Sequence, residues 1–477
     1  MMKILLTGAT GYIAQRLLPV LVDAGHTVVC CVRDMKRFHI EDDWQQQVTK
    51  VEVDFLKPNS LTNIPLDIDV VYYLIHSMST STGDFSEMEQ QSAQNFVNGI
   101  ENTSARQIIY LSGIVNDDHL SQHLQSRKNV EMILSNSSVP LTTLKAGIIV
   151  GSGSASFEIM RDLVEKLPIM IAPRWLNTRC QPIAIRNVIQ YLSGVLLNEQ
   201  TFNQSFDIGG PDVLTFKQML LQFAQVRKLK RHILVVPLMT PKLSSYWLYF
   251  VTSTNFSLAK NLVKSMSVEV VCQPNKLGDL FPIKLIPYNE AIELAFDKID
   301  QNQVLSSWTD ALTSQTLRKG ISAYISVPEK GCFQDQRIVK LHNPDLALEN
   351  IFAIGGKRGW YYANWLWAVR GLLDKMVGGT GIRRGRKNDT DILPGEALDF
   401  WRILVADKSK KRLLLYAEMK LPGEAWLEFT INSHNELVQT ATFRPLGLLG
   451  RLYWYSVLPF HAFIFKGMAK NIATKEY

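Results

Sequence analysis

The sequence predicts an α/β fold for its first 150 residues, built on a doubly wound parallel sheet, and an α+β fold for its last third. Three observations carry this prediction. Short apolar runs alternate with helical segments up to residue 150, a pair of glycines follows the first run, and strand-like runs after residue 410 precede a long apolar segment. Alternating strands and helices are typical of a parallel sheet that helices cover on both faces.

Composition limits the class of protein. A chain of 477 residues with 46% hydrophobic and 20% charged residues has a globular composition and is long enough for two or three domains. Its five cysteines form no C-x-x-C pair, and their odd number argues against a disulfide framework. We therefore predict a reduced, cytoplasmic protein without a metal site.

The first 150 residues contain the strands and helices of the predicted sheet. The strands are expected at 3–7, 27–32, 48–53, 70–75, 107–112 and 141–149, and the helices at 12–24, 85–101 and 122–136. Gly25 follows the first helix, where helices commonly end on glycine, and Pro19 should bend that helix. These elements predict parallel strands joined by helical crossovers.

Residues 151–325 are expected to form a smaller lobe beside the carboxyl edge of the sheet, with one clear helix at 215–227. Pro328 and Gly331 interrupt the chain and predict a boundary at 326–331. The first domain then comprises residues 1–325 and the second comprises residues 332–477.

In the second domain, strand-like runs at 413–420, 424–431 and 437–444 precede the apolar segment 446–472. Arg451 and His461 place polar groups in that segment, and Pro459 interrupts it. Few stretches of it are long enough and free enough of charge to span a bilayer, which takes about 20 apolar residues. We therefore expect a bent core helix rather than a membrane span.

The net charge of +7 is concentrated in the second domain. Residues 1–329 hold 29 Lys and Arg against 30 Asp and Glu, whereas residues 330–477 hold 22 against 14. The basic clusters at 383–387 and 408–412 fit a solvated loop, or contact with an anionic ligand or the inner membrane surface. Nucleic acid is excluded as a partner, because no nucleic-acid-binding motif accompanies the charge.

The spacing Gly8-x-x-Gly11-x-x-Ala14 between a strand and a helix predicts a dinucleotide site. Glycines let the backbone approach a pyrophosphate, and the free N–H groups of the helix N-terminus attract it. The cofactor-binding candidates are the residues of this turn: Thr7, Gly8, Thr10, Gly11, Tyr12 and Ile13.

Arg33 ends the second expected strand, where a carboxylate would bind the ribose 2′-OH of NAD. A guanidinium at this place suits a 2′-phosphate, because it offers a fork of donors and a fixed charge. The sequence therefore predicts NADP, with NAD as the alternative cofactor. Pairing of Arg33 with the neighbouring Asp34 is the structural alternative.

Three further strand ends contribute cofactor candidates, and one of them is Ser112 at the end of the fifth strand. Asp54 could accept a hydrogen bond from the adenine amino group with Phe55 against the ring, or it could cap a turn. Ile75 and His76 end the fourth strand, which places them beside the ribose or nicotinamide, although a structural histidine is equally compatible.

Several segments together resemble the short-chain dehydrogenase/reductase superfamily, and more closely its atypical, NmrA-like and epimerase-like branch. They are T-G-A-T-G-Y-I-A, the Arg33 tip, V-D-F, Y-L-I-H-S-M, Y-L-S-G and K-A-G-I-I-V-G-S-G-S. The similarity extends to about residue 320. The resemblance implies a Rossmann-type NAD(P)-binding fold, and it does not identify a substrate.

The catalytic pattern of that superfamily is a serine with a Y-x-x-x-K pair, in which tyrosine exchanges a proton and lysine lowers its pKa. Ser112 matches the serine, whereas His123 and Arg127 occupy the places of tyrosine and lysine. A histidine could transfer a proton near neutral pH, and an arginine could hold a ribose or phosphate but cannot shuttle protons. His123 and Arg127 are therefore either a repurposed catalytic pair or part of a noncatalytic helix surface.

The second domain contains I-G-G-K-R-G-W-Y-Y-A-N-W-L-W, G-G-T-G-I-R-R-G-R and F-R-P-L-G-L-L-G-R-L-Y-W-Y-S-V-L-P-F-H. These segments resemble a bacterial domain of unknown function that is fused behind such reductase-like domains. The resemblance implies a helix-grip, START-like fold, in which a curved sheet wraps a terminal helix. The aromatic residues at 359–367 and 446–465 would line a pocket for a lipophilic ligand or fill the core.

Two functions fit these observations. The first is an NADP-dependent oxidoreductase that acts on a lipophilic or aromatic carbonyl compound captured by the second domain. The second is a noncatalytic NAD(P)-binding redox sensor or assembly factor, which the missing Y-x-x-x-K pair favours. A sugar-nucleotide epimerase is a minor third alternative, which the same missing pair weakens.

Overall fold

The structure is a computed structural model of the chain. It describes residues 1–35, 38, 40, 42–75, 85–114, 122–236, 268–300, 327, 332–377, 379, 381 and 392–475. The chain divides into two compact units, Met1–Leu312 and Thr313–Tyr477. The boundary expected at 326–331 falls almost wholly outside the described residues, as does the basic cluster at 383–387.

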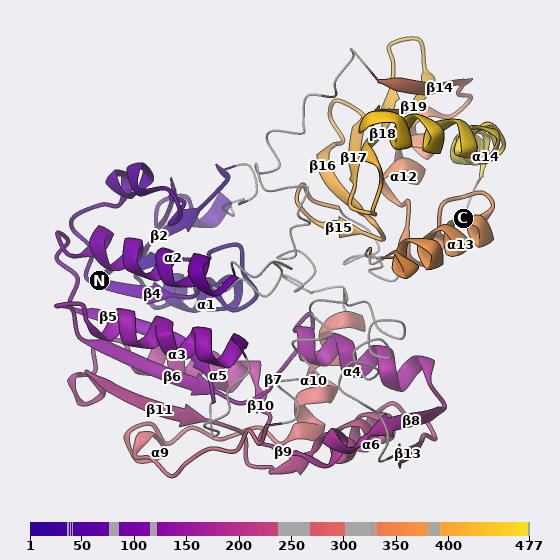
Figure 1. Ribbon diagram of the computed structural model, residues 1–477. Helices are drawn as coiled ribbons and strands as arrows, with labels where there is room; N and C mark the ends of the chain where they lie inside the picture. Colours follow the sequence, from indigo (N-terminus) through magenta and orange to yellow (C-terminus); the bar gives the residue numbers. More distant parts are fainter. Residues whose placement is uncertain are drawn as a thin grey trace. The chain divides into compact units, whose positions relative to one another are not determined.

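The first unit contains a seven-stranded parallel sheet in the order β11-β6-β5-β4-β1-β2-β3, which confirms the predicted Rossmann-type sheet (Figure 1). Four helices accompany it: α1 (Ala14–Asp23), α2 (Phe85–Ile100), α3 (Gln122–Ser135) and α5 (Ile185–Gly194). Its strands are β1 (Lys3–Leu6), β2 (Thr27–Val32), β3 (Val48–Glu52), β4 (Val70–Tyr73), β5 (Gln107–Gly113), β6 (Leu141–Ala146) and β11 (Gln204–Ile208).

Alternate residues of each strand face opposite layers of helices. Leu6 and Tyr72 pack with α1 and α5 on one face, whereas Leu5 and Tyr73 pack with α2 and α3 on the other. Both faces are therefore apolar, which explains why these strands are continuous hydrophobic runs in the sequence. The strand order reverses between β1 and β4, and such a switch point opens a crevice at the carboxyl ends of the strands.

The lobe after β6 has a separate core and is interleaved with the sheet. Phe157, Phe223 and Phe296 contact one another at its centre. Thr215 and Gln218 form a capping box that starts α6 (Phe216–Val226), close to the predicted bounds. The other elements of the lobe are β7 (Ile149–Val150), α4 (Ala155–Lys166), β8 (Ile169–Pro173), β9 (Arg179–Cys180), β10 (Ile183–Ala184), β12 (Leu214–Thr215), β13 (His232–Val236), α9 (Leu277–Leu280) and α10 (Tyr288–Asp300).

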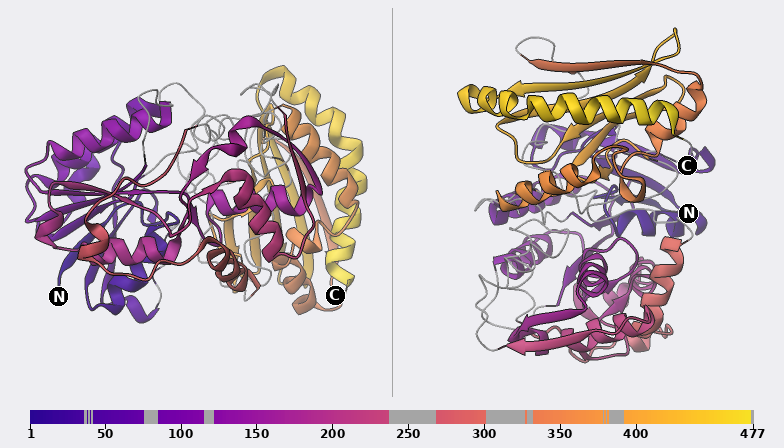
Figure 2. Two further views of the ribbon diagram at one scale, coloured as in Figure 1. Left: turned by 90° about the horizontal axis from the view of Figure 1, so that it is seen from below. Right: turned by 90° about the vertical axis from the view of Figure 1, so that its right-hand side faces the viewer.

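The second unit is a six-stranded antiparallel sheet in the order β14-β19-β18-β17-β16-β15, and three helices accompany it in the part of the unit that the structure describes (Figures 1 and 2). The helices are α12 (Pro344–Phe352), α13 (Asn364–Met376) and α14 (Gly447–Thr474). The strands are β14 (Phe333–Lys340), β15 (Ala397–Leu398), β16 (Trp401–Asp407), β17 (Arg412–Ala417), β18 (Gly423–Ile431) and β19 (Glu436–Pro445). This is the predicted α+β arrangement, with a long terminal helix against a sheet.

Helix α14 continues past Pro459, so the proline does not divide the predicted terminal helix. Among the described helices, none combines the length and the apolar character that crossing a membrane requires. The core beside α14 holds Trp360, Trp367, Phe400 and Phe465, whose rings pack against one another. The indole of Trp360 also donates a hydrogen bond to Asp399 over 2.8 Å. Trp360, Trp367 and Phe465 are therefore core residues, the second of the two roles we considered for the aromatic residues of these segments.

Candidate cofactor site

The turn between β1 and α1 requires glycine at position 8. Gly8 has a φ of 62°, and a Cβ atom there would lie 2.7 Å from the carbonyl oxygen of Leu74, just after β4. The N–H of Gly11 donates to the carbonyl of Gly8 over 2.7 Å, which closes the turn. A side chain at residue 8 would collide with the backbone that follows β4, so the tight turn depends on glycine, the residue type that dinucleotide-binding turns use at this position.

The residues that lead into α1 present free donors at the same place. Gln15 donates to the carbonyl of Gly11 over 3.1 Å, whereas the N–H groups of Tyr12 and Ile13 have no acceptor among the residues that the structure describes. The helix begins at Ala14 without a side-chain cap. Unpaired N–H groups at the positive end of a helix dipole are suited to a pyrophosphate.

Thr7 supports this turn from below. Its hydroxyl donates to the carbonyl of Tyr72 over 2.9 Å and accepts from the N–H of Leu74 over 3.0 Å. The side chain is fully buried, so both functions of the hydroxyl are used in joining β1 to the end of β4. Thr7 is therefore a positioning residue rather than the direct ligand we predicted, whereas Thr10 is partly exposed on the turn.

Arg16 is a residue of this site that the sequence analysis missed. Its guanidinium stacks 3.8 Å from the centre of the Tyr12 ring and donates to the carbonyls of Tyr12, over 3.0 Å, and Ser152, over 2.8 Å. The Tyr12 hydroxyl lies against Gly151, and burial raises the pKa of Tyr12 to about 12. Arg16 thereby fixes the glycine turn to the loop 151–154, which the sequence marks only by its G-S-G-S pattern.

Arg33 lies at the carboxyl end of β2, next to the glycine turn, and its side chain is exposed. Within the described ranges, its guanidinium makes no ion pair or hydrogen bond, so the predicted alternative of pairing with Asp34 is not observed. Ile75 follows β4, with its backbone nitrogen 3.5 Å from where a Cβ of Gly8 would lie. His76 is outside the described residues.

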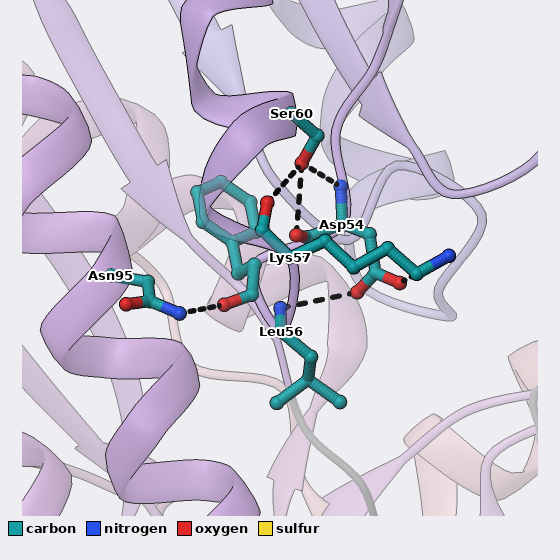
Figure 3. Close-up of polar contacts among 6 residues, drawn as sticks. Asp54, Leu56, Lys57, Ser60 and Asn95 are labelled. Carbon is teal, nitrogen blue, oxygen red and sulfur yellow. Dashed lines mark hydrogen bonds and ion pairs between the residues drawn. The ribbon is translucent and has the colours of Figure 1, made fainter.

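Asp54 has the turn-capping role that we considered beside adenine binding (Figure 3). One carboxylate oxygen accepts from the N–H of Leu56 over 3.2 Å, and the other lies 3.7 Å from the ammonium of Lys57. The hydroxyl of Ser60 accepts from the N–H of Asp54 over 2.9 Å and donates to its carbonyl. These contacts bind Asp54 into the turn before the 3-10 helix η3 (Pro58–Asn63).

The ring of Phe55 does not lie beside a cofactor crevice. It is buried in the core under α2, with its centre 5.7 Å from that of Phe96. Its carbonyl accepts from the side-chain amide of Asn95 over 2.6 Å. The expectation that Phe55 stacks on adenine is therefore wrong for this conformation, because core packing already covers the ring.

The structure brings Ser112 and Arg127 together at the end of β5. Ser112 is buried, and a Cβ at the adjacent Gly113 would lie 2.7 Å from Nη1 of Arg127. Burial raises the pKa of the nearby Tyr110 to about 12, with the positive charge of Arg127 acting in the opposite direction. His123 lies one turn earlier on α3, and its side chain is outside the described residues.

Two polar contacts hold α3 against its neighbours and were not predicted. Glu131, one turn after Arg127, forms an ion pair with Lys145 of β6 over 3.1 Å. The hydroxyl of Ser126 donates to the buried carboxylate of Glu89 on α2 over 2.5 Å. These contacts fix the face of α3 that carries Arg127 at the carboxyl edge of the sheet. The described residues hold no cluster of His, Cys, Asp and Glu that could bind a metal ion.

Comparison with known proteins identifies the kind of domain in each unit. Residues 8–162 match a family described as NAD(P)H-binding, and residues 329–468 match a protein family of unknown function, DUF2867. The first unit thus contains an NAD(P)H-binding Rossmann domain. The solved structure of a nucleoside-diphosphate-sugar epimerase from Staphylococcus aureus superposes with a TM-score of 0.50 at 15% identity, covering 61% of this chain and 100% of that one. That likeness shows an epimerase-like fold.

Two curated proteins are similar to the first unit in sequence. The photosystem II assembly factor Ycf39 of Synechocystis is 24% identical over 152 residues, which are 31% of this chain and 46% of that protein. The divinyl chlorophyllide a 8-vinyl-reductase of Arabidopsis thaliana is 21% identical over 226 residues, 44% of this chain and 53% of that enzyme. The chain thus spans about half the length of the curated relatives it matches.

Proposed function

We propose that this protein is an NADPH-dependent reductase of a lipophilic carbonyl or conjugated unsaturated compound. The observation that carries the proposal is the glycine turn at Gly8 and Gly11, with free N–H groups on α1 and an unpaired Arg33 at the end of the neighbouring strand. This arrangement supports binding of a dinucleotide, and the position of Arg33 favours one with a 2′-phosphate.

Each part of the crevice has a distinct task in binding. The N–H groups of Tyr12 and Ile13 would bind the pyrophosphate, and Arg33 would pair with the 2′-phosphate. Thr7 and Arg16 hold the turn in position from opposite sides. When bound, NADPH supplies the hydride for the reduction.

We propose that a substrate meets the reducing end of the cofactor beside Ser112 and Arg127, which lie together at the end of β5. The Arg127 guanidinium can stabilise negative charge that develops on a substrate oxygen, and the Ser112 hydroxyl can donate a hydrogen bond to it. Arginine remains protonated, so the proton must come from another group, for which we propose His123.

The acceptor class is inferred from two sources. Carbonyl reduction follows from the resemblance to short-chain reductases, and a conjugated carbon–carbon double bond follows from the relatives named vinyl-reductases. Both kinds of acceptor develop charge next to a hydride-accepting carbon, which the Arg127 guanidinium would stabilise.

The experiment is a titration of the purified full chain with NADPH, followed by measurement of NADPH oxidation with hydrophobic aldehydes, aromatic ketones and conjugated alkenes. We expect turnover that falls about 100-fold or more in Arg127→Met, the cost of removing one preorganised charge at a reacting oxygen. Lys128→Met is the matched control, because Lys128 is the next residue and is exposed. Equal activity in the two variants would contradict the role of Arg127.

A noncatalytic NAD(P)H-binding assembly factor is the second candidate function. His123 and Arg127 replace the usual tyrosine and lysine, and one relative is named an assembly factor. For this function, NADPH would bind tightly and stay unoxidised with every acceptor. The same titration and turnover measurements therefore distinguish the two candidates.

A further inference from the structure

Helix α13 buries Trp367 in the core but leaves most of its other apolar side chains exposed. Residues spaced by three and four along the helix form one exposed stripe, and their side chains are 45% to 66% exposed: Trp365, Val369, Leu372, Leu373 and Met376. The charged residues Asp374 and Lys375 of the same helix are buried. Asp374 accepts hydrogen bonds from the N–H groups of Gly381 and Lys420, over 2.9 and 2.7 Å. Apart from Trp367 and Leu366, which pack with the core, the large apolar side chains of α13 are therefore exposed rather than packed into their own domain.

The first half of α14 carries a second exposed apolar stripe. Its members are 54% to 73% exposed: Leu448, Leu449, Leu452, Tyr455, Phe460 and Phe463. Both helices cover the same side of the six-stranded sheet (Figure 2). The stripes adjoin where α13 begins, because Tyr362 packs edge-on against Phe463 with ring centres 5.1 Å apart. We call these eleven side chains the apolar helix face.

The charge around this face is positive. Helix α14 contains Arg451, Lys466 and Lys470 and no acidic residue, and Arg451 is exposed between the leucines of the stripe. The only acidic residue of α13 is the buried Asp374. Leucine, tryptophan and tyrosine side chains flanked by basic residues are typical of helices that lie in the plane of a membrane interface.

We propose that the apolar helix face binds the surface of an anionic lipid bilayer. Eleven large apolar side chains that are each 45% or more exposed form an apolar patch that is unusual on the surface of a soluble protein. Such a patch marks an interaction site. A protein partner would need hydrogen-bonding groups on the face, about one per 100–200 Å² of interface, and here Ser456 and Arg451 supply few. A second copy would bring like charges together, because residues 330–477 carry 22 basic against 14 acidic residues, whereas anionic lipid attracts them.

The test is co-sedimentation of the full chain with vesicles of phosphatidylcholine alone and vesicles that also contain phosphatidylglycerol. We expect binding to the anionic vesicles that weakens as salt is raised. Replacing one leucine on each helix, Leu372→Glu with Leu452→Glu, should weaken binding at least about tenfold, since two apolar anchors are lost. Arg451→Gln should weaken it about fivefold, the effect of one basic residue near the surface.

Leu66→Glu is the matched control, because Leu66 is 65% exposed and belongs to the first unit. Near-ultraviolet circular dichroism checks that the aromatic core of each variant is intact. Brominated lipids should quench the fluorescence of Trp365, so the total quenching should be smaller in the Trp365→Phe variant than in the original protein. Failure to bind anionic vesicles, or binding that the leucine pair leaves unchanged, would overturn the proposal. A concentration-dependent dimer that the leucine pair dissociates would overturn it in favour of a protein interface.

Discussion

Replacing Gly8 by alanine tests whether the turn after β1 is the cofactor cradle. The substitution adds one methyl group at a φ of 62°, where its carbon would lie 2.7 Å from the carbonyl oxygen of Leu74. Such a contact is closer than real Cβ atoms make, so β1 and the end of β4 must move apart. The hydroxyl of Thr7 bridges these two strands, and this movement would strain both of its hydrogen bonds.

Gly25→Ala is the control that separates the conformational cost of Gly8→Ala from its steric cost. Gly25 has a φ of 79°, but a Cβ there would meet no atom within 4 Å. Gly25→Ala should therefore lower the free energy of unfolding only by the conformational cost of a left-handed alanine, about 1–2 kcal/mol. Gly8→Ala adds an overpacking cost of about 1–3 kcal/mol to the same conformational cost. We therefore expect Gly8→Ala to be the more destabilising change, by about 1–3 kcal/mol.

Two measurements check this reasoning. Urea unfolding gives the free energy of unfolding of each variant, and fluorescence titration gives its Kd for NADPH. We expect the Kd to rise at least about tenfold in Gly8→Ala, equivalent to 1.4 kcal/mol, and to stay unchanged in Gly25→Ala. A folded Gly8→Ala protein that binds NADPH as tightly as the Gly25→Ala protein would refute the placement of the cofactor.

Three further predictions concern single side chains. Arg33→Ala should lower the NADPH-to-NADH affinity ratio about tenfold or more, because charge-assisted hydrogen bonds are lost. Arg106→Ala, at the opposite edge of the sheet, should leave this ratio unchanged. Equal affinity ratios for the two variants in fluorescence titrations would contradict the role of Arg33. Arg402→Met should destabilise the second unit by about 3–5 kcal/mol in urea, since the buried carboxylate of Glu418 loses a 2.9 Å partner, and adding Glu418→Gln should recover part of that loss. Burial lowers the pKa of His461 to about 4, below the usual value of about 6.5 in the unfolded chain, so the unfolded state binds the proton more readily. Stability of the second unit should therefore fall by up to about 3 kcal/mol as pH drops from about 6.5 to about 4, and identical pH dependence of thermal unfolding in His461→Phe would exclude this cause.

The sheet of the first unit could be predicted because its signals are local. Each central strand is a continuous apolar run, and the glycine spacing marks the turn within a segment of seven residues, 8–14. In contrast, β14 alternates exposed polar and partly buried residues at the edge of its sheet, and the sequence analysis did not identify it. An edge strand with one solvated face carries a weaker hydrophobic signal than a buried one.

The roles of individual site residues depended on contacts between distant parts of the chain. The hydroxyl of Thr7 donates to the carbonyl of Tyr72, 65 residues later, and the guanidinium of Arg16 donates to the carbonyl of Ser152, 136 residues later. Phe55 was predicted from its place after a strand, but its ring turns into the core against Phe96. A pattern of residue types can place a side chain at the end of a strand, but the tertiary fold decides what that side chain contacts.

After the lobe, the chain returns to the sheet and forms β11. This return limits where the protein can be divided into fragments. Residues Gln204–Ile208 pair with residues 142–146 of β6, and the buried amide of Gln107 donates to the carbonyl of Val195 and accepts from the N–H of Leu197. A fragment ending near residue 162 would expose the backbone of β6 as an open edge and leave Gln107 without these acceptors and donors. Such a fragment should aggregate. A chimera with a related protein therefore has to include this chain to at least residue 208.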